Sequence, residues 1–115
     1  GRQPLMLMRN CPRRAAAGSR CTGSGGCGGP ERPGGLIDRR RSVFPVMCGG
    51  GCAELLNAVP LYWADRLDEL PELDFRLLHF TDESRAEAAD ILRAYRCGGP
   101  IKENITRGLY RRGVE

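Results

Sequence analysis

The sequence predicts an α/β fold of short strands and helices with a Gly/Cys-rich loop. Three observations support this: short aliphatic runs bounded by breakers, a helical stripe behind a capping box, and a glycine-rich stretch rich in cysteine. With 115 residues, the chain is long enough for one domain at most. Its composition, 41% hydrophobic and 28% charged, excludes collagen, a coiled coil and a low-complexity tail.

The first half predicts strands around this loop. Residues 5–8 form an aliphatic run that predicts a short buried strand, ending just before Cys11. Residues 36–39 and 43–47 are β-prone and close together, which predicts a hairpin with Pro45 on an edge. Residues 15–35, between the first strand and this hairpin, carry eight glycines and two prolines, so they predict a loop and no long helix or strand.

The second half, residues 53–115, predicts a β-α-β-α order. A strand is expected at 54–57, a helix of about nine residues between Pro60 and Pro71, and a strand at 74–80. A second helix is expected after Ser84, because Ser84 and Glu87 have the spacing of a capping box, and Gly98 ends its apolar stripe.

Charge and cysteine divide the chain at the same place. Residues 1–52 hold nine arginines against two acidic residues, whereas residues 53–115 hold nine basic against twelve acidic residues. Five of the six cysteines also lie in residues 1–52. We interpret residues 1–52 as a basic, Cys/Gly-rich segment that carries a site and residues 53–115 as its scaffold, the alternative for the charge alone being a solvated arginine surface.

The cysteines favour a metal or cluster site. Only Cys48 and Cys52 have the short spacing usual in structural zinc sites, so zinc is one candidate. Iron–sulfur clusters also bind thiolates, and the neighbouring glycines let backbone amides approach cluster sulfurs. A disulfide framework and simple buried thiols stay open as alternatives. Cys97 is expected to pack as a small hydrophobe.

The remaining candidates favour structural roles. His79, the single histidine, is expected in the 74–80 strand as a packed core residue. Trp63 and Tyr62 are expected to anchor a helix to a core. No metalloprotease motif or P-loop is present, and no apolar run approaches the roughly 20 residues that span a bilayer, so no membrane partner is expected. A solvated helix face is expected for Asp65, Asp68, Glu69 and Glu72.

Several ordered segments together resemble the collagenase-like peptidase family U32, in particular the closing part of its long bacterial members. The resemblance implies that residues 1–115 are a C-terminal fragment of a larger cytoplasmic protein, whose main body is a TIM-barrel-like domain and whose remainder is the fragment's partner. The segments that carry it are residues 4–12 (PLMLMRNCP), 36–40 (LIDRR), 44–46 (FPV), 52–57 (CAELLN), 61–66 (LYWADR) and 106–115 (TRGLYRRGVE).

The resemblance also implies an activity and a cofactor. The family is named for proteolysis of collagen-type substrates, while several relatives hydroxylate RNA bases or a quinone precursor and carry a cubane iron–sulfur (4Fe–4S) cluster on four cysteines. Cys11 and Cys52 match the family text best, Cys21 and Cys27 fall where further ligands are expected, and Cys48 is an extra candidate. The expected parent is therefore a peptidase or a redox hydroxylase acting on a peptide, RNA or a small molecule, and the fragment alone is expected to be inactive.

A second hypothesis involves no catalysis. A zinc-stabilised basic module would bind RNA through its arginines. The phosphate contacts expected in that case are Arg13, Arg14, Arg39, Arg40 and Arg41.

Overall fold

The computed structural model describes residues 1–12, 35–49 and 52–108. The chain divides into two compact units. We call Gln3–Ala58 the sheet unit, and Gly1–Arg2 together with Val59–Glu115 the helix unit.

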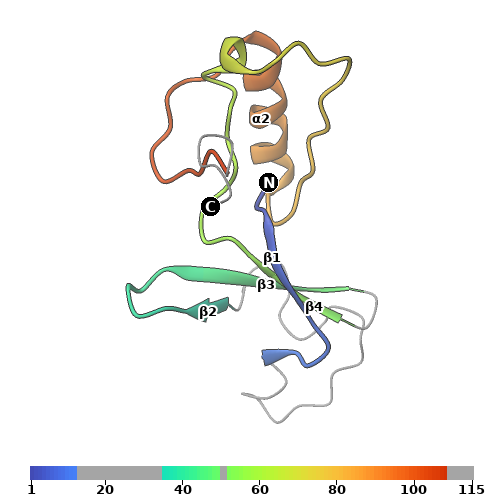
Figure 1. Cartoon of the computed structure of the whole chain (residues 1–115), viewed down its shortest axis with the longest axis vertical. Helices are drawn as coiled ribbons and strands as arrows, with labels where there is room; N and C mark the ends of the chain where they lie inside the picture. The colour runs from blue at the N-terminus through green and yellow to red at the C-terminus, as the bar shows by residue number, and fades with distance from the viewer. Residues whose placement is uncertain (13–34, 50–51, 109–115) are drawn as a thin grey trace. The chain divides into compact units, whose positions relative to one another are not determined.

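The sheet unit contains four described strands: β1 (Pro4–Met8), β2 (Gly35–Ile37), β3 (Val43–Gly49) and β4 (Cys52–Leu56). Each neighbouring pair is antiparallel, and the order across the sheet is β1-β4-β3-β2 (Figure 1). The structure therefore confirms the predicted strands at 5–8 and 54–57 and the hairpin formed by 36–39 and 43–47.

Pro45 marks the point where β3 changes partner. Val43–Pro45 pair with β2, whereas Val46 and the residues after it pair with β4. Because proline has no backbone N–H to donate, it is tolerated where one ladder stops and the other begins. Pro45 itself therefore pairs with β2 alone and has a partner on one side only among the described strands, as expected for a proline on an edge.

The core of the sheet unit is small. Among its described residues, Val46, Ala53 and Leu56 are buried hydrophobic residues, and Leu56 is fully buried. In contrast, Leu7 on β1 is 71% exposed and Ile37 on β2 is 69% exposed. The sequence predicted a buried strand at residues 5–8, and this is wrong in burial: four of the five residues of β1 are exposed, and β4 is its single neighbour among the described strands.

The helix unit contains the helix α2 (Arg85–Cys97). At its start the Ser84 side chain accepts from the Glu87 amide at 3.3 Å, and the Glu87 carboxylate accepts from the Ser84 amide at 2.8 Å. The hydrogen bond from Ser84 lowers the pKa of Glu87. Gly98 follows with a φ of 82°, a conformation that favours glycine. Both predicted ends of this helix are confirmed.

Replacing Ser84 by alanine should weaken this helix end. The Glu87 amide would lose its acceptor, and loss of such a cap costs about 0.5–2 kcal/mol. Thermal unfolding followed by far-UV circular dichroism measures the change. Glu87→Gln is the matched control, because glutamine keeps an acceptor for the Ser84 amide. Equal losses in stability for the two variants would contradict the capping role.

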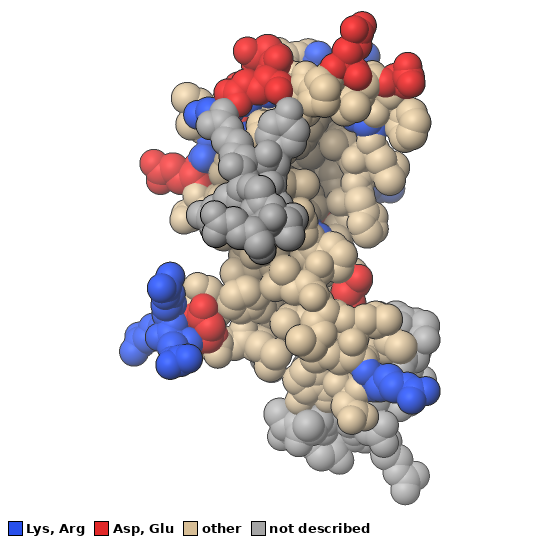
Figure 2. Space-filling model, in the orientation of Figure 1, with Lys and Arg blue, Asp and Glu red and all other residues tan. Residues whose placement is uncertain are grey.

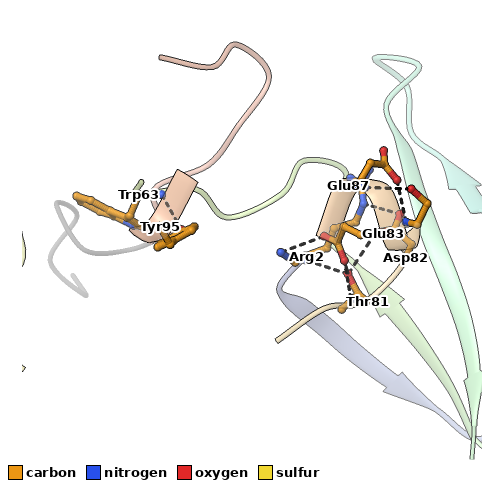
Figure 3. Close-up of polar contacts among 9 residues, drawn as sticks. Arg2, Trp63, Thr81, Asp82, Glu83, Glu87 and Tyr95 are labelled. Atoms are coloured by element: carbon orange, nitrogen blue, oxygen red, sulfur yellow. Dashed lines mark hydrogen bonds and ion pairs between the residues drawn. The ribbon is translucent and has the colours of Figure 1, made fainter. Parts of the chain in front are cut away.

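The helix predicted between Pro60 and Pro71 does not form. Leu61 instead makes an isolated parallel bridge to Thr106, and only a short 3-10 helix, η1 (Leu67–Glu69), follows. The cause is visible in the backbone hydrogen bonds: the Tyr62 amide donates to the Thr106 carbonyl at 3.1 Å, and the Trp63 amide donates to the Tyr95 hydroxyl at 2.9 Å (Figure 3). The carbonyls of this segment are also taken: the Pro60 carbonyl accepts from the Thr106 amide at 2.9 Å and the Ala64 carbonyl from the Gly99 amide at 2.8 Å. In a helix these carbonyls would bind the amides four residues further along, so their bonds to distant segments compete with a helix.

The strand predicted at 74–80 is also absent, since none of these residues belongs to a strand. Phe75 and Leu77 are 83% and 85% exposed, and His79 is exposed. The interpretation of His79 as a packed core residue is therefore wrong. Residues 74–80 have the alternating hydrophobic pattern of a strand, but no described strand forms a ladder with them.

The class prediction holds in its coarse form: the described residues combine strands with one α-helix. The β-α-β-α order does not appear in the described part of residues 53–115. Nor is the described sheet part of a TIM barrel, because its strands are antiparallel and barrel strands are parallel. Within the described residues, no helix has the length and apolar character needed to cross a membrane.

Candidate metal centre

Cys52 is the first residue of β4, at the end of the sheet unit where β3 turns into β4. Gly49 pairs with Cys52, and Cys48 pairs with Ala53. The connection between the paired residues is Gly50 and Gly51, which lie outside the described residues. Cys52 is partly exposed, so its thiol is close to both backbone and solvent.

Cys11 follows the neighbouring strand β1. β1 runs antiparallel to β4, and Met8 pairs with Ala53. The chain that continues past Met8 to Cys11 therefore leaves the sheet at the end where Cys52 begins β4. Cys11 is also partly exposed. Sequence positions 41 residues apart are thus brought to one end of one sheet by strand pairing.

Cys21 and Cys27 lie outside the described residues.

The side chains of Cys48 and Cys52 lie on opposite faces of the β3–β4 hairpin. Side chains alternate along a strand, and directly paired residues share a face. Cys48 shares a face with Ala53, its partner, whereas Cys52 is one residue along β4 and faces the other way. The two cysteines with zinc-like spacing therefore do not face one ion while this ladder is intact.

Cys97 ends α2 and is exposed, so the expectation that it packs as a small hydrophobe is wrong. No disulfide joins any two of the four described cysteines, Cys11, Cys48, Cys52 and Cys97. Within residues 1–12, 35–49 and 52–108, no group of three or more Cys, His, Asp or Glu side chains is placed to hold a metal. Any four-thiolate site would need the residues beyond that range.

A buried ion pair in the helix unit was missed by sequence reasoning. Arg107 donates to both carboxylate oxygens of Asp65 at 2.7 Å and to the Tyr62 carbonyl at 2.6 Å. The Asp65 side chain is only 3% exposed, although the sequence predicted a solvated acidic face. The hydrogen bond from Arg107 is the main cause that holds the pKa of Asp65 below its ordinary value.

Aromatic residues surround this ion pair. The Arg107 guanidinium lies 5.3 Å from the centre of the Trp63 ring, and the rings of Tyr62 and Tyr95 meet edge to face at 6.0 Å. Tyr62 and Trp63 are 3% and 7% exposed, so their predicted role as core anchors is confirmed, without the helix. This cluster stabilises the fold and contains no nucleophile beside a base.

Three consecutive arginines of the sheet unit lie at the β2–β3 turn. Arg39, Arg40 and Arg41 are all exposed there, and Figure 2 shows blue atoms projecting from the surface with red atoms beside them. Asp38 orders the turn by accepting hydrogen bonds from two of its amides. The other two arginines expected to contact phosphate, Arg13 and Arg14, lie outside the described residues.

Comparison with protein-family models, curated proteins and solved structures finds no match to this chain.

Proposed function

We propose that Cys11, Cys21, Cys27 and Cys52 bind an iron–sulfur cluster, and that the chain is the C-terminal part of a larger cytoplasmic enzyme similar to family U32. The observation that carries the proposal is the strand pairing, which brings Cys11 and Cys52 to one end of the sheet. The basic, glycine-rich sequence around them is a suitable setting for anionic cluster sulfurs.

The donor set fits the group. Four thiolates are the usual ligands of a cubane cluster, and the two described ones are partly exposed, as a site completed by a further segment requires. When bound, the cluster would supply one-electron redox chemistry. The chain's own contribution is to hold the thiolates, with positive charge close by at Arg9, two residues before Cys11.

A cluster favours the hydroxylase alternative over the peptidase alternative for the parent enzyme. Proteolysis by a nucleophile needs an activating base, and the single histidine, His79, is exposed in a segment without regular structure. The remaining machinery, including a barrel, would belong to the rest of the parent chain. RNA, a peptide or a small molecule would be the substrate.

Single Cys→Ala variants test the ligand set in protein purified without oxygen. We expect Cys11→Ala and Cys52→Ala each to lose most of the bound iron, because a cubane cluster needs all four thiolates. Cys97→Ala is the matched control, since Cys97 is exposed at the end of α2 in the other unit, and its iron content should be unchanged.

Two results would overturn the proposal. One is unchanged iron in the variants of Cys11, Cys21, Cys27 and Cys52. The other is a colourless protein with one zinc per chain, which would make the cysteine segment structural. Cys11→Ala keeps the test informative if Cys52→Ala does not fold, because Cys11 lies outside the strands.

A further inference from the structure

We propose that the β2–β3 turn is a contact surface for the backbone phosphates of a nucleic acid. The proposal goes beyond the cluster and does not depend on it. It starts from three consecutive exposed residues, Arg39, Arg40 and Arg41. None of the three forms an ion pair within the described residues. Their exposure gives the three guanidinium groups access to anions in solution.

The turn is ordered by its own backbone and by Asp38. The Asp38 carboxylate accepts from the Arg40 amide at 2.8 Å and from the Ser42 amide at 2.9 Å. The Arg41 amide donates to the Asp38 carbonyl, and the Asp38 amide donates to the Ser42 carbonyl, both at 3.1 Å. The carboxylate is thus occupied with backbone amides, and the turn holds its arginines on a fixed frame.

Arg41 occupies a position where glycine is favoured. Its φ is 62°, in the left-handed region, as expected for the last residue of a three-residue hairpin loop. A side chain in this region is disfavoured for L-residues, and glycine relieves the cost. The chain keeps an arginine at this position despite the backbone cost, which points to a use for its side chain.

The chemistry of the turn fits phosphates better than an acidic protein surface. Guanidinium groups bind phosphate oxygens with paired hydrogen bonds, and backbone phosphate contacts need exposed charge and no buried anchor. A protein partner would need an apolar anchor at the centre of the contact, and residues 38–42 contain none. Because phosphates carry no base identity, we expect binding without sequence preference.

The test uses the full chain with two probes, a single-stranded RNA of about 16 nucleotides and a DNA duplex of the same sequence. The dissociation constant is measured over a range of salt concentrations. In Arg41→Gly the salt slope for RNA should fall by about 0.7–1, because one phosphate contact is lost. Its thermal stability should be unchanged or higher, since glycine tolerates the backbone conformation.

A triple variant, Arg39→Ala with Arg40→Ala and Arg41→Gly, should lower the slope by roughly 2–3. The matched control removes three exposed arginines from α2, namely Arg85, Arg93 and Arg96, and changes the net charge equally. We expect this control variant to keep most of the wild-type salt dependence of RNA binding.

Equal loss of binding in the two triple variants would reduce the effect to net charge and overturn the proposal. So would the absence of binding to both nucleic acids at low salt. Poly-glutamate is the third probe, and binding to it as tight as to RNA would assign the surface to acidic proteins instead. Tighter binding to either the RNA or the duplex supports the proposal and identifies which nucleic acid the turn prefers.

Discussion

Leu56→Ala is expected to destabilise the sheet unit by about 2–5 kcal/mol, the usual cost of deleting a buried leucine side chain. Leu56 is fully buried, and the other buried hydrophobic residues among the described part of the sheet unit are only Val46 and Ala53. A unit with so few buried side chains has little stability in reserve, so a loss of this size should expose β4 to solvent.

Amide hydrogen exchange of β4 measures this loss. Protection at Ala53 and Leu55 should fall sharply in Leu56→Ala. Leu7→Ala is the matched control, because Leu7 is 71% exposed on the strand next to β4 and its removal should leave protection nearly unchanged. If the two variants exchange alike, Leu56 does not anchor the core.

Arg107→Ala is expected to cause the largest loss of stability in the helix unit. It would leave the Asp65 carboxylate, 3% exposed, without its bidentate partner and the Tyr62 carbonyl without this donor. Removing one member of a buried pair is strongly destabilising. We expect the Tm, followed by Trp63 fluorescence, to fall by about 10 °C.

Two further variants test the geometry of this contact. Arg107→Lys keeps the charge but loses the planar fork, so its Tm should lie between those of wild type and Arg107→Ala. Arg93→Ala removes an exposed ion pair with Asp90 and should change the Tm by no more than about 2 °C. A similar Tm for Arg107→Ala and Arg93→Ala would contradict the structural role of the buried pair.

The same pair also makes stability depend on pH. Because Arg107 lowers the pKa of Asp65 in the folded state, the unfolded chain binds the proton first as the pH falls. The contribution of Asp65 is complete above the ordinary carboxyl pKa and is lost on acidification below about pH 4. Asp65→Asn should remove this part of the pH dependence, and an unchanged acid limb in that variant would contradict the account.

Local signals predicted the elements that depend on local interactions. The capping box of Ser84 and Glu87 fixes the start of α2 through bonds between neighbouring residues. The β2–β3 hairpin likewise needs only two β-prone runs and a short turn. Where residues close in sequence form the backbone hydrogen bonds, the sequence pattern is sufficient to predict the element.

Distant contacts decided the segments that the sequence mispredicted. The carbonyls of Pro60 and Ala64 accept from the amides of residues 106 and 99, so a helical pattern there did not become a helix. The ion pair of Asp65 and Arg107 joins positions 42 residues apart. No local sequence pattern indicates that these two residues pair. The same limit applies to the cysteines: the strands after Cys52 and before Cys11 were predictable, but their pairing was not.

The most direct test of the central claim is the visible absorption spectrum of the longest form of the protein purified without oxygen, with iron, acid-labile sulfide and zinc determined on the same sample. If the four cysteines hold a cluster, we expect a brown protein with broad charge-transfer absorption and matched amounts of iron and sulfide. A colourless protein without iron would contradict the claim that Cys11, Cys21, Cys27 and Cys52 hold a cluster.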